Sequence, residues 1–403
     1  MSLFFSTSIL KAEGIDEKIN EWFQPISDAW GGIVLYPIRF TDEISIPFVL
    51  LLLVFGALFF TIRFSFVNVR QFPIAINTVR GKYDELEKGT EKTEISIDGD
   101  ISDTIRDESN EGEVSHFQAL ATAVSGTVGL GNIAGVALAI ALGGPGATFW
   151  MIICGLIGMS TKFVECTLGV RYRDVGEDGT VYGGPMYYLS KGLKEGGYER
   201  FGKVLAGLFA ILCVGASFGG GNAAQSNQAA MQLSSILGIE GGSAGTMIGF
   251  VLAIVVGVVI IGGIKRIASV TEKIVPFMAA IYVMACLFII LSNFSYIDDA
   301  FSLIFSNAFN MPSVAGGFIG VMIVGFQRAA FSNEAGAGSA SIAHSAVKTK
   351  YPASEGVVAL LEPFIDTVVI CTMTALVIIM YNSTGIFEYG QDVIINGEKI
   401  EGA

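Results

Sequence analysis

A polar, glycine-rich segment interrupts the apolar run 117–142, which is long enough to cross a bilayer. The segment is 125–135, and its central glycines are Gly126, Gly129 and Gly131. Glycine weakens a helix and frees its backbone groups. In hydrocarbon, freed amides and carbonyls persist only where they face protein, water or a ligand. Because Thr127 and Asn132 accompany these glycines, the segment predicts a binding site in a broken membrane helix.

A second polar segment, residues 326–338, interrupts the predicted span 313–342 in the same way. The first unit of five spans covers 115–291, and a second unit starts at residue 313 in the opposite direction across the membrane. Discontinuous helices at matching positions of two inverted units are typical of the site of a secondary transporter. The sequence therefore predicts two broken helices that share one site.

The predicted second unit is shorter than the first. Residues 313–381 contain two spans, and 382–403 read as an extracytoplasmic loop. An inverted repeat with equal halves would need roughly three further helices. We therefore expect this chain to be a fragment with an incomplete second repeat.

The composition indicates an all-α polytopic membrane protein. Hydrophobic residues make up 52% and charged residues 15% of the 403 residues, whereas soluble proteins carry roughly a quarter charged residues. About eight spans are expected in a transporter core at 44–381. They lie at 44–66, 115–143, 147–168, 203–236, 245–263, 270–291, 313–342 and 355–381.

Two further segments flank or interrupt this core. Residues 1–43 contain tryptophan and tyrosine among charged residues, which is typical of a segment at the membrane interface. Residues 84–113 are acidic and predict a solvated cytoplasmic loop, for which a regulatory role stays open. The loops on the side of residues 63–113 carry 18 of the 24 lysines and arginines. This bias places the N-terminus outside a plasma (inner) membrane.

The broken helices can recognise both ends of a free amino acid. The N–H groups at the start of a half-helix favour a carboxylate, and the carbonyls at the end of a half-helix favour a cation. Near Gly129, the amides can hold a carboxylate. The carbonyls of Thr127 and Val128 and the side chain of Asn132 offer the oxygen ligands that sodium prefers. Glycines that merely permit close helix packing are the alternative.

Amide side chains on the span 203–236 predict a wall of the site. Helical spacing places one set of residues on one face, where neutral amides can bind a zwitterion. Hydrogen bonds between packed helices explain the same pattern nearly as well. The set is Phe218, Asn222, Gln225, Ala229 and Gln232.

Charged residues within the predicted spans are few and fall into two groups. Lys162 and Glu165 lie near the end of a span, which favours a local pair that reaches toward the interface. Arg328, Glu334 and Asp366 lie deeper, so a gate or ion role is expected for them, with an Arg328–Glu334 structural pair as the alternative.

Enzymatic readings find little support in the sequence. The five cysteines form no CxxC pair, the two histidines belong to no metal motif, and no nucleophile–base set is recognisable. The glycines at 129 and 131 match a dinucleotide fingerprint, but the strand and the acidic residue that it requires are missing. We therefore expect no enzyme, no cofactor apart from sodium as coupling ion, and no nucleic-acid partner.

Five ordered motifs resemble the alanine or glycine:cation symporter family. The resemblance runs from about residue 44 to 381 and implies a leucine-transporter-like fold with sodium-coupled uptake of alanine or glycine. The motifs are residues 125–135, 143–147, 183–188, 331–339 and 364–367.

The resemblance also implies roles for individual residues. It assigns sodium to Ser125, Thr127, Val128, Asn132 and Ser332, and an aromatic lid to Phe331. Its implied substrate contacts, taken with the predicted wall, are Gly126, Thr127, Gly129, Phe218, Asn222, Gln225, Phe331 and Asn333. Glu334 departs from the small hydroxyl residue expected at its position.

The resulting hypothesis is sodium-coupled symport of a small neutral amino acid by alternating access. Three alternatives stay open: proton coupling through Glu334 or Asp366, another small amino acid, and a membrane sensor that does not transport. The lipid bilayer, sodium and the amino acid are the expected partners, and the sequence indicates no oligomeric state.

Overall fold

The computed structural model describes residues 15–40, 45–87, 112–238, 244–309, 317–382, 393–395 and 398–400. Helices dominate these residues, and the strands form only short two-stranded pairs, so the all-α prediction is confirmed. Most of the predicted acidic loop 84–113, and most of the predicted loop 382–403, lie outside the described residues.

The chain divides into two compact units, residues 1–52 and 53–403. In the first unit, α1 (Ile15–Val34) precedes the antiparallel pair β1 (Pro37–Arg39) and β2 (Ser45–Pro47). Trp22 on α1 is 73% exposed. An exposed aromatic helix is compatible with the predicted interfacial segment, which stays a prediction. The helix α2 (Phe48–Arg63) starts in this unit and continues into the second.

The second unit contains the helices that form the two breaks. The first broken pair is α6 (His116–Thr127) with α7 (Leu130–Gly143), and the second is α15 (Gly317–Asn333) with α16 (Ala340–His344). The other helices that bear on the site are α8 (Gly146–Arg171), α10 (Glu199–Ala216), η2 (Ser217–Ala223), α11 (Ala224–Leu237), α17 (Pro352–Ala359), α18 (Leu361–Pro363), η4 (Phe364–Cys371) and α19 (Thr372–Tyr381).

The remaining elements of this unit connect or surround these helices. They are α3 (Val67–Arg70), α4 (Phe72–Val79), α5 (Asp84–Glu87), β3 (Asp174–Val175), β4 (Val181–Tyr182), α9 (Pro185–Glu195), α12 (Ala244–Ile260), α13 (Gly263–Ser292), η3 (Phe294–Tyr296), α14 (Ile297–Phe309), β5 (Val393–Ile395) and β6 (Glu398–Ile400). Helix α14 lies between the predicted spans 270–291 and 313–342, where Asp298 and Asp299 favour a loop in the sequence.

Four helical stretches in the described residues are long and apolar enough to cross a membrane, and the bent α6–α7 pair makes a fifth. The four are 146–171, 199–237, 263–292 and 352–381. The helices α2 and α12 are apolar but shorter. A polytopic membrane protein is therefore confirmed, whereas the number of eight spans stays a prediction.

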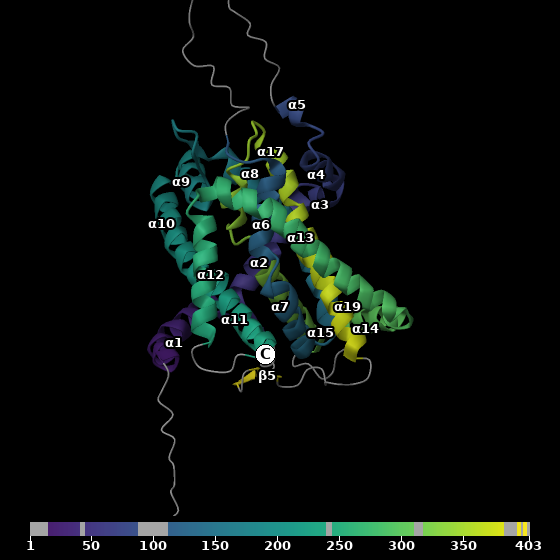
Figure 1. Ribbon diagram of the computed structural model, residues 1–403. Coiled ribbons are helices and arrows are strands. Elements are labelled where there is room, and N and C mark those ends of the chain that lie inside the picture. Colours follow the sequence, from purple (N-terminus) through teal and green to yellow (C-terminus); the bar gives the residue numbers. More distant parts are fainter. Residues whose placement is uncertain are drawn as a thin grey trace, which may run out of the picture. The chain divides into compact units, whose positions relative to one another are not determined.

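Among the helices of residues 53–403 (Figure 1), α8 packs against α14, α15, α16 and α17. Small residues allow this close packing. A Cβ atom on Gly356 of α17 would lie 1.9 Å from Thr167 Oγ1, and one on Gly325 of α15 would lie 2.6 Å from the carbonyl oxygen of Ala147. Helix α8 contacts both halves of the second break and also α17. At Gly325 and Gly356, this packing leaves no room for larger side chains.

Local sequence signals set the helix ends around the site. Ser115 and Gln118 form a capping box that starts α6. Pro352 occupies the first turn of α17, where its missing N–H costs nothing. Two π-helical segments interrupt the long helices: η2, which contains three glycines, and η4, which directly follows Pro363. Such segments change the direction of side chains and are frequent at functional sites.

Candidate functional site

The first break separates α6 from α7 at Val128 and Gly129. The backbone of Val128 is extended, and the two helices bend by 42°. The amide of Gly129 donates to Asn132 Oδ1 at 2.8 Å, and the amide of Leu130 donates to Gln225 Oε1 at 3.3 Å. The predicted break is therefore present, and side-chain amides accept hydrogen bonds from the backbone groups that it frees.

The second break lies between α15 and α16. Glu334 has φ 51°, in a left-handed region that non-glycine residues seldom occupy, and Gly336 and Gly338 have φ 93° and 94°. Ser339 Oγ donates to the Glu334 carboxylate, and the amide of Gly336 donates to Glu165 Oε2 at 3.2 Å. The turn is therefore held by carboxylates, and Glu334 has no ion pair with Arg328 among the described residues.

The two breaks touch each other. Asn132 Nδ2 donates to Ser332 Oγ at 3.1 Å. A Cβ atom on Gly131 would lie 3.0 Å from Ser332 Cα, so the close approach requires glycine at this position. Residues 200 positions apart in sequence therefore form one site.

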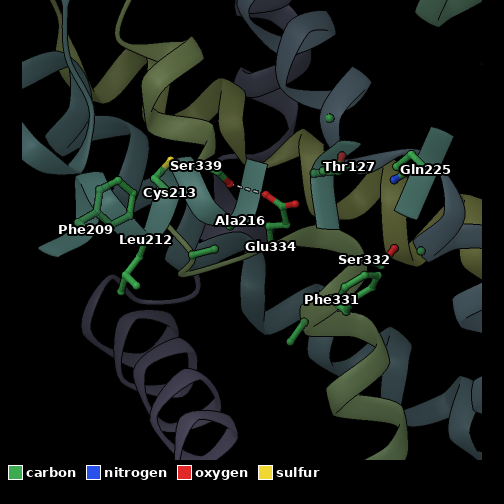
Figure 2. A pocket seen from close by; sticks show the side chains of 15 residues that line it. Thr127, Phe209, Leu212, Cys213, Ala216, Gln225, Phe331, Ser332, Glu334 and Ser339 are labelled. Atoms are coloured by element: carbon green, nitrogen blue, oxygen red, sulfur yellow. Dashed lines mark hydrogen bonds between the residues drawn. The ribbon is translucent and has the colours of Figure 1, made fainter. Parts of the chain in front are cut away.

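A cavity of about 460 Å³ opens beside this contact. Figure 2 shows Thr127, Gln225, Ser332 and Phe331 at one end of the view and side chains of α10 at the other, with Glu334 between them. Of the predicted site residues, Gly126, Thr127, Gln225, Phe331, Ser332 and Glu334 line it.

The α10 side of the cavity was not predicted from the sequence. It consists of Phe209, Leu212, Cys213 and Ala216. Their helical spacing was visible in the sequence, but an apolar stripe on a membrane span indicates packing as readily as a binding surface. Ser339, which follows the second break, also lines the cavity.

Only one member of the predicted amide wall reaches the cavity. Gln225 lines it, whereas Phe218 is 71% exposed and Asn222 is also exposed, and neither lines it. Both lie in η2, the π-helical segment. A π-helix has more residues per turn than an α-helix, so the α-helical spacing used for the prediction no longer places them beside Gln225.

Behind the cavity lies a buried cluster of polar side chains around Asp366. Its carboxylate accepts hydrogen bonds from Asn132 Nδ2 at 2.8 Å, Ser332 Oγ at 2.8 Å and Thr367 Oγ1 at 2.8 Å. Asp366 is fully buried, and Cys371 Sγ lies 3.3 Å from Asn132 Nδ2. The π-helical η4 carries Asp366, Thr367 and Cys371. The sequence grouped Asn132 with Ser332 but did not place Asp366 with them.

This cluster has the chemistry of a small-cation site. It offers a carboxylate and two hydroxyl oxygens, which are ligands that hard cations prefer, while Asn132 contributes its Nδ2 donor to the cluster. Asn333 extends the cluster, because its Nδ2 donates to Thr367 Oγ1 at 3.0 Å. Asn333 is buried here and does not line the cavity, although the prediction made it a substrate contact.

The remaining predicted residues lie away from the cavity. Ser125 is exposed, and its hydroxyl donates to the carbonyl oxygen of Thr122 at 2.6 Å. Val128 packs against an apolar cluster, and Gly129 faces the Gln225 amide, 3.1 Å from where its Cβ would lie. Arg328 is half-buried, and its Nε has no hydrogen-bond partner within the described part of the chain.

Comparison with known proteins identifies the family to which this chain belongs. A sequence model of the sodium:alanine symporter family matches residues 36–396. The chain belongs to the sodium:alanine symporter family. The family membership expected from the five motifs is thereby confirmed.

Three relatives illustrate the range of this symporter family. The sodium/alanine symporter AgcS of Methanococcus maripaludis is 43% identical over 333 residues, which are 82% of this chain and 67% of AgcS. The amino-acid carrier protein AlsT of Bacillus subtilis is 38% identical over 86% of this chain and 68% of AlsT. The probable sodium/glutamine symporter GlnT of the same organism is 36% identical over 84% of this chain and 64% of GlnT. The match thus spans about two thirds of each relative.

Proposed function

We propose that this protein is a sodium-coupled symporter that carries a small neutral amino acid, alanine or glycine, into the cell by alternating access. The observation that carries the proposal is the contact between the two broken helices at Asn132 and Ser332, directly beside the cavity. A ligand there touches both helices at once, so its binding can favour one arrangement of the pair over another.

The proposed sodium site is the Asp366 cluster. Asp366, Ser332 and Thr367 would supply the oxygen ligands, while Asn132 orients Asp366 and Ser332 through its Nδ2. A cation compensates the buried carboxylate, which is otherwise stabilised only by neutral donors. Because Asn132 and Ser332 both contact Asp366 and come from different broken helices, sodium bound at Asp366 would stabilise the contact between the two helices.

The proposed amino-acid site is the cavity. Gln225 and Thr127 are neutral polar groups that can bind a zwitterion, and Glu334 offers a carboxylate to an ammonium group. Its volume lies within the usual range for small-molecule sites and does not by itself select alanine. The relative GlnT is named a probable sodium/glutamine symporter, and glutamine is larger than alanine.

We further propose a leucine-transporter-like fold with an inverted repeat. Its two repeat units, 115–291 and the one that starts at residue 313, would cross the membrane in opposite directions, and the N-terminus would lie outside. Each proposed unit contains one broken helix, α6–α7 in the first and α15–α16 in the second, which supports this arrangement. The distribution of basic residues supports the orientation.

The test of symport is uptake of labelled alanine by proteoliposomes that contain the full-length protein. We expect uptake to depend on an inward sodium gradient. Uptake that does not exceed a sodium-free control would contradict the proposal. Proton coupling is a second candidate because Asp366 is a buried carboxylate, and uptake driven by a pH gradient in sodium-free buffer would favour it.

Gln225 tests the geometry of the amino-acid site. Replacing it with alanine removes the acceptor for the Leu130 amide and one polar group of the cavity. We expect the KM for alanine to rise about 5- to 30-fold, from the loss of a hydrogen bond worth ~1–2 kcal/mol. Asn222→Ala is the matched control, since Asn222 is an exposed amide on the preceding π-helical segment. Equal effects of both variants would instead support the wall predicted from helical spacing.

A further inference from the structure

A cluster of buried acidic and basic side chains lies within residues 53–403, apart from the cavity. Lys162 Nζ lies 3.0 Å from Glu362 Oε1, and His344 Nδ1 lies 2.5 Å from Glu355 Oε1. His116 Nδ1 forms a further contact with the other Glu355 oxygen. Four of these five side chains are 0% exposed. Buried ionisable groups inside a membrane protein are expensive and therefore suggest a function.

His344 lies in the middle of this cluster, between the carboxylates of Glu355 and Glu362. Its Nε2 lies 3.8 Å from Glu362 Oε2. Neither of these two atoms has a hydrogen-bond partner among the described residues. A separation of 3.8 Å is longer than a hydrogen bond, but it brings Nε2 close enough to the carboxylate for a charge on the imidazole to interact with it. A proton on Nε2 would be attracted to this carboxylate, whereas the lone pair of an unprotonated Nε2 would face it unfavourably.

The charges around His344 favour this proton. The helices packed around it contribute three carboxylates and two basic groups besides His344 itself. Without a charge on His344, the buried carboxylates of Glu355 and Glu362 would keep only His116 and Lys162, respectively, as basic contacts among the described residues. The titratable groups are His116 on α6, Lys162, Glu165 and Cys166 on α8, Tyr188 on α9, Glu355 on α17 and Glu362 on α18. Nearby Arg173 donates to the carbonyl oxygens of Ser345 and Val347.

A metal ion does not explain the arrangement. Within the described residues, no group of three or more histidine, cysteine, aspartate or glutamate side chains could hold one. Lys162 also lies against Glu362, where it would repel a metal cation. The proton is therefore the cation that fits.

We propose that His344, with Glu355 and Glu362, is a proton-binding site that ties one half of the second broken helix to α17 and α18. His344 is the last residue of α16, and Ser339, just before α16, lines the cavity. The bound proton thus fixes the helix next to the amino-acid site. This ligand is neither sodium nor the amino acid, so the site stands independently of the proposed symport.

Nuclear magnetic resonance of histidine tests the proposal directly. The 403 residues contain only two histidines, so protein labelled with 15N-histidine and purified without a histidine tag gives few imidazole signals. The signals lost in His344→Asn identify His344. We expect them to report the doubly protonated ring at pH 7.5, at which a free histidine is mostly neutral. A neutral ring at pH 7.5 would overturn the proposal.

Two glutamine variants identify the origin of the effect. In Glu362→Gln or Glu355→Gln, the midpoint of the His344 titration should fall by about 1–3 pH units, since each removes an adjacent opposite charge. Glu272→Gln is the matched control, because Glu272 accepts a hydrogen bond from Gln118 on α6, at 2.9 Å, and does not contact His344. An unchanged midpoint in both test variants would overturn the proposal, as would an equal shift in the control. None of these readouts requires transport, so failure of symport would leave them interpretable.

Discussion

Asp366→Asn is expected to lower the apparent affinity for sodium by at least about 30-fold, or ~2 kcal/mol. Asparagine keeps the size of the side chain and one acceptor oxygen but removes the negative charge. The Asp366 carboxylate accepts three hydrogen bonds at 2.8 Å, from residues on both broken helices and on η4. Without it, a bound sodium ion would be coordinated only by neutral oxygens. The measurement is the sodium concentration that gives half-maximal alanine uptake by the full-length protein.

The matched control for this variant is Cys371→Ala. Cys371 Sγ lies 3.3 Å from Asn132 Nδ2 and 3.4 Å from Ser332 Oγ, so it touches the same cluster without contributing a charge. We expect its sodium affinity to change by less than about threefold. If Asp366→Asn binds sodium as well as the unaltered protein and loses only uptake driven by a pH gradient, Asp366 carries a proton, and the sodium assignment is wrong.

The broken helices could be predicted because their cause is local. Gly129, Gly131, Gly336 and Gly338 interrupt apolar runs, and the structure has a break at each of these two segments. The pairing of Asn132 with Ser332 followed from the expectation that the breaks share one site. Local sequence was therefore sufficient for the all-α membrane class and for six of the fifteen residues that line the cavity.

The unpredicted parts depend on geometry that the sequence does not display. The π-helical segment η2 turns Phe218 and Asn222 away from the Gln225 side of the helix. The segment η4 brings Asp366 to the two breaks. Both segments have the i→i+5 hydrogen bonds of a π-helix, which change the direction of the side chains and which hydropathy patterns cannot detect.

Long-range pairing was likewise hidden from the sequence. We expected Lys162 to pair locally with Glu165 and to reach toward the membrane interface. Lys162 is instead 0% exposed and pairs with Glu362, 200 residues away, while Glu165 accepts a hydrogen bond from the Gly336 amide. The prediction of a local, interfacial pair was wrong because neighbours on one helix are visible in sequence, whereas partners on another helix are not.

The buried Lys162–Glu362 pair makes Lys162→Met the most destabilising substitution that we predict. Methionine fills a similar volume but leaves Glu362, and the buried cluster to which it belongs, without the positive charge of the lysine. Breaking a buried ion pair by removing one partner typically costs ~3–5 kcal/mol. We expect the melting midpoint of the detergent-purified protein to fall by roughly 5–10 °C.

Two comparisons separate this charge effect from the loss of packing. Lys203→Met removes a pair of similar length, 2.8 Å to Glu199, whose side chains are 68% and 45% exposed. Exposed pairs contribute little, so its melting midpoint should stay nearly unchanged. The double variant Lys162→Met with Glu362→Gln removes the uncompensated carboxylate and should recover at least half of the loss. If the double variant is as unstable as Lys162→Met alone, the lysine stabilises the helices by packing and not by its charge.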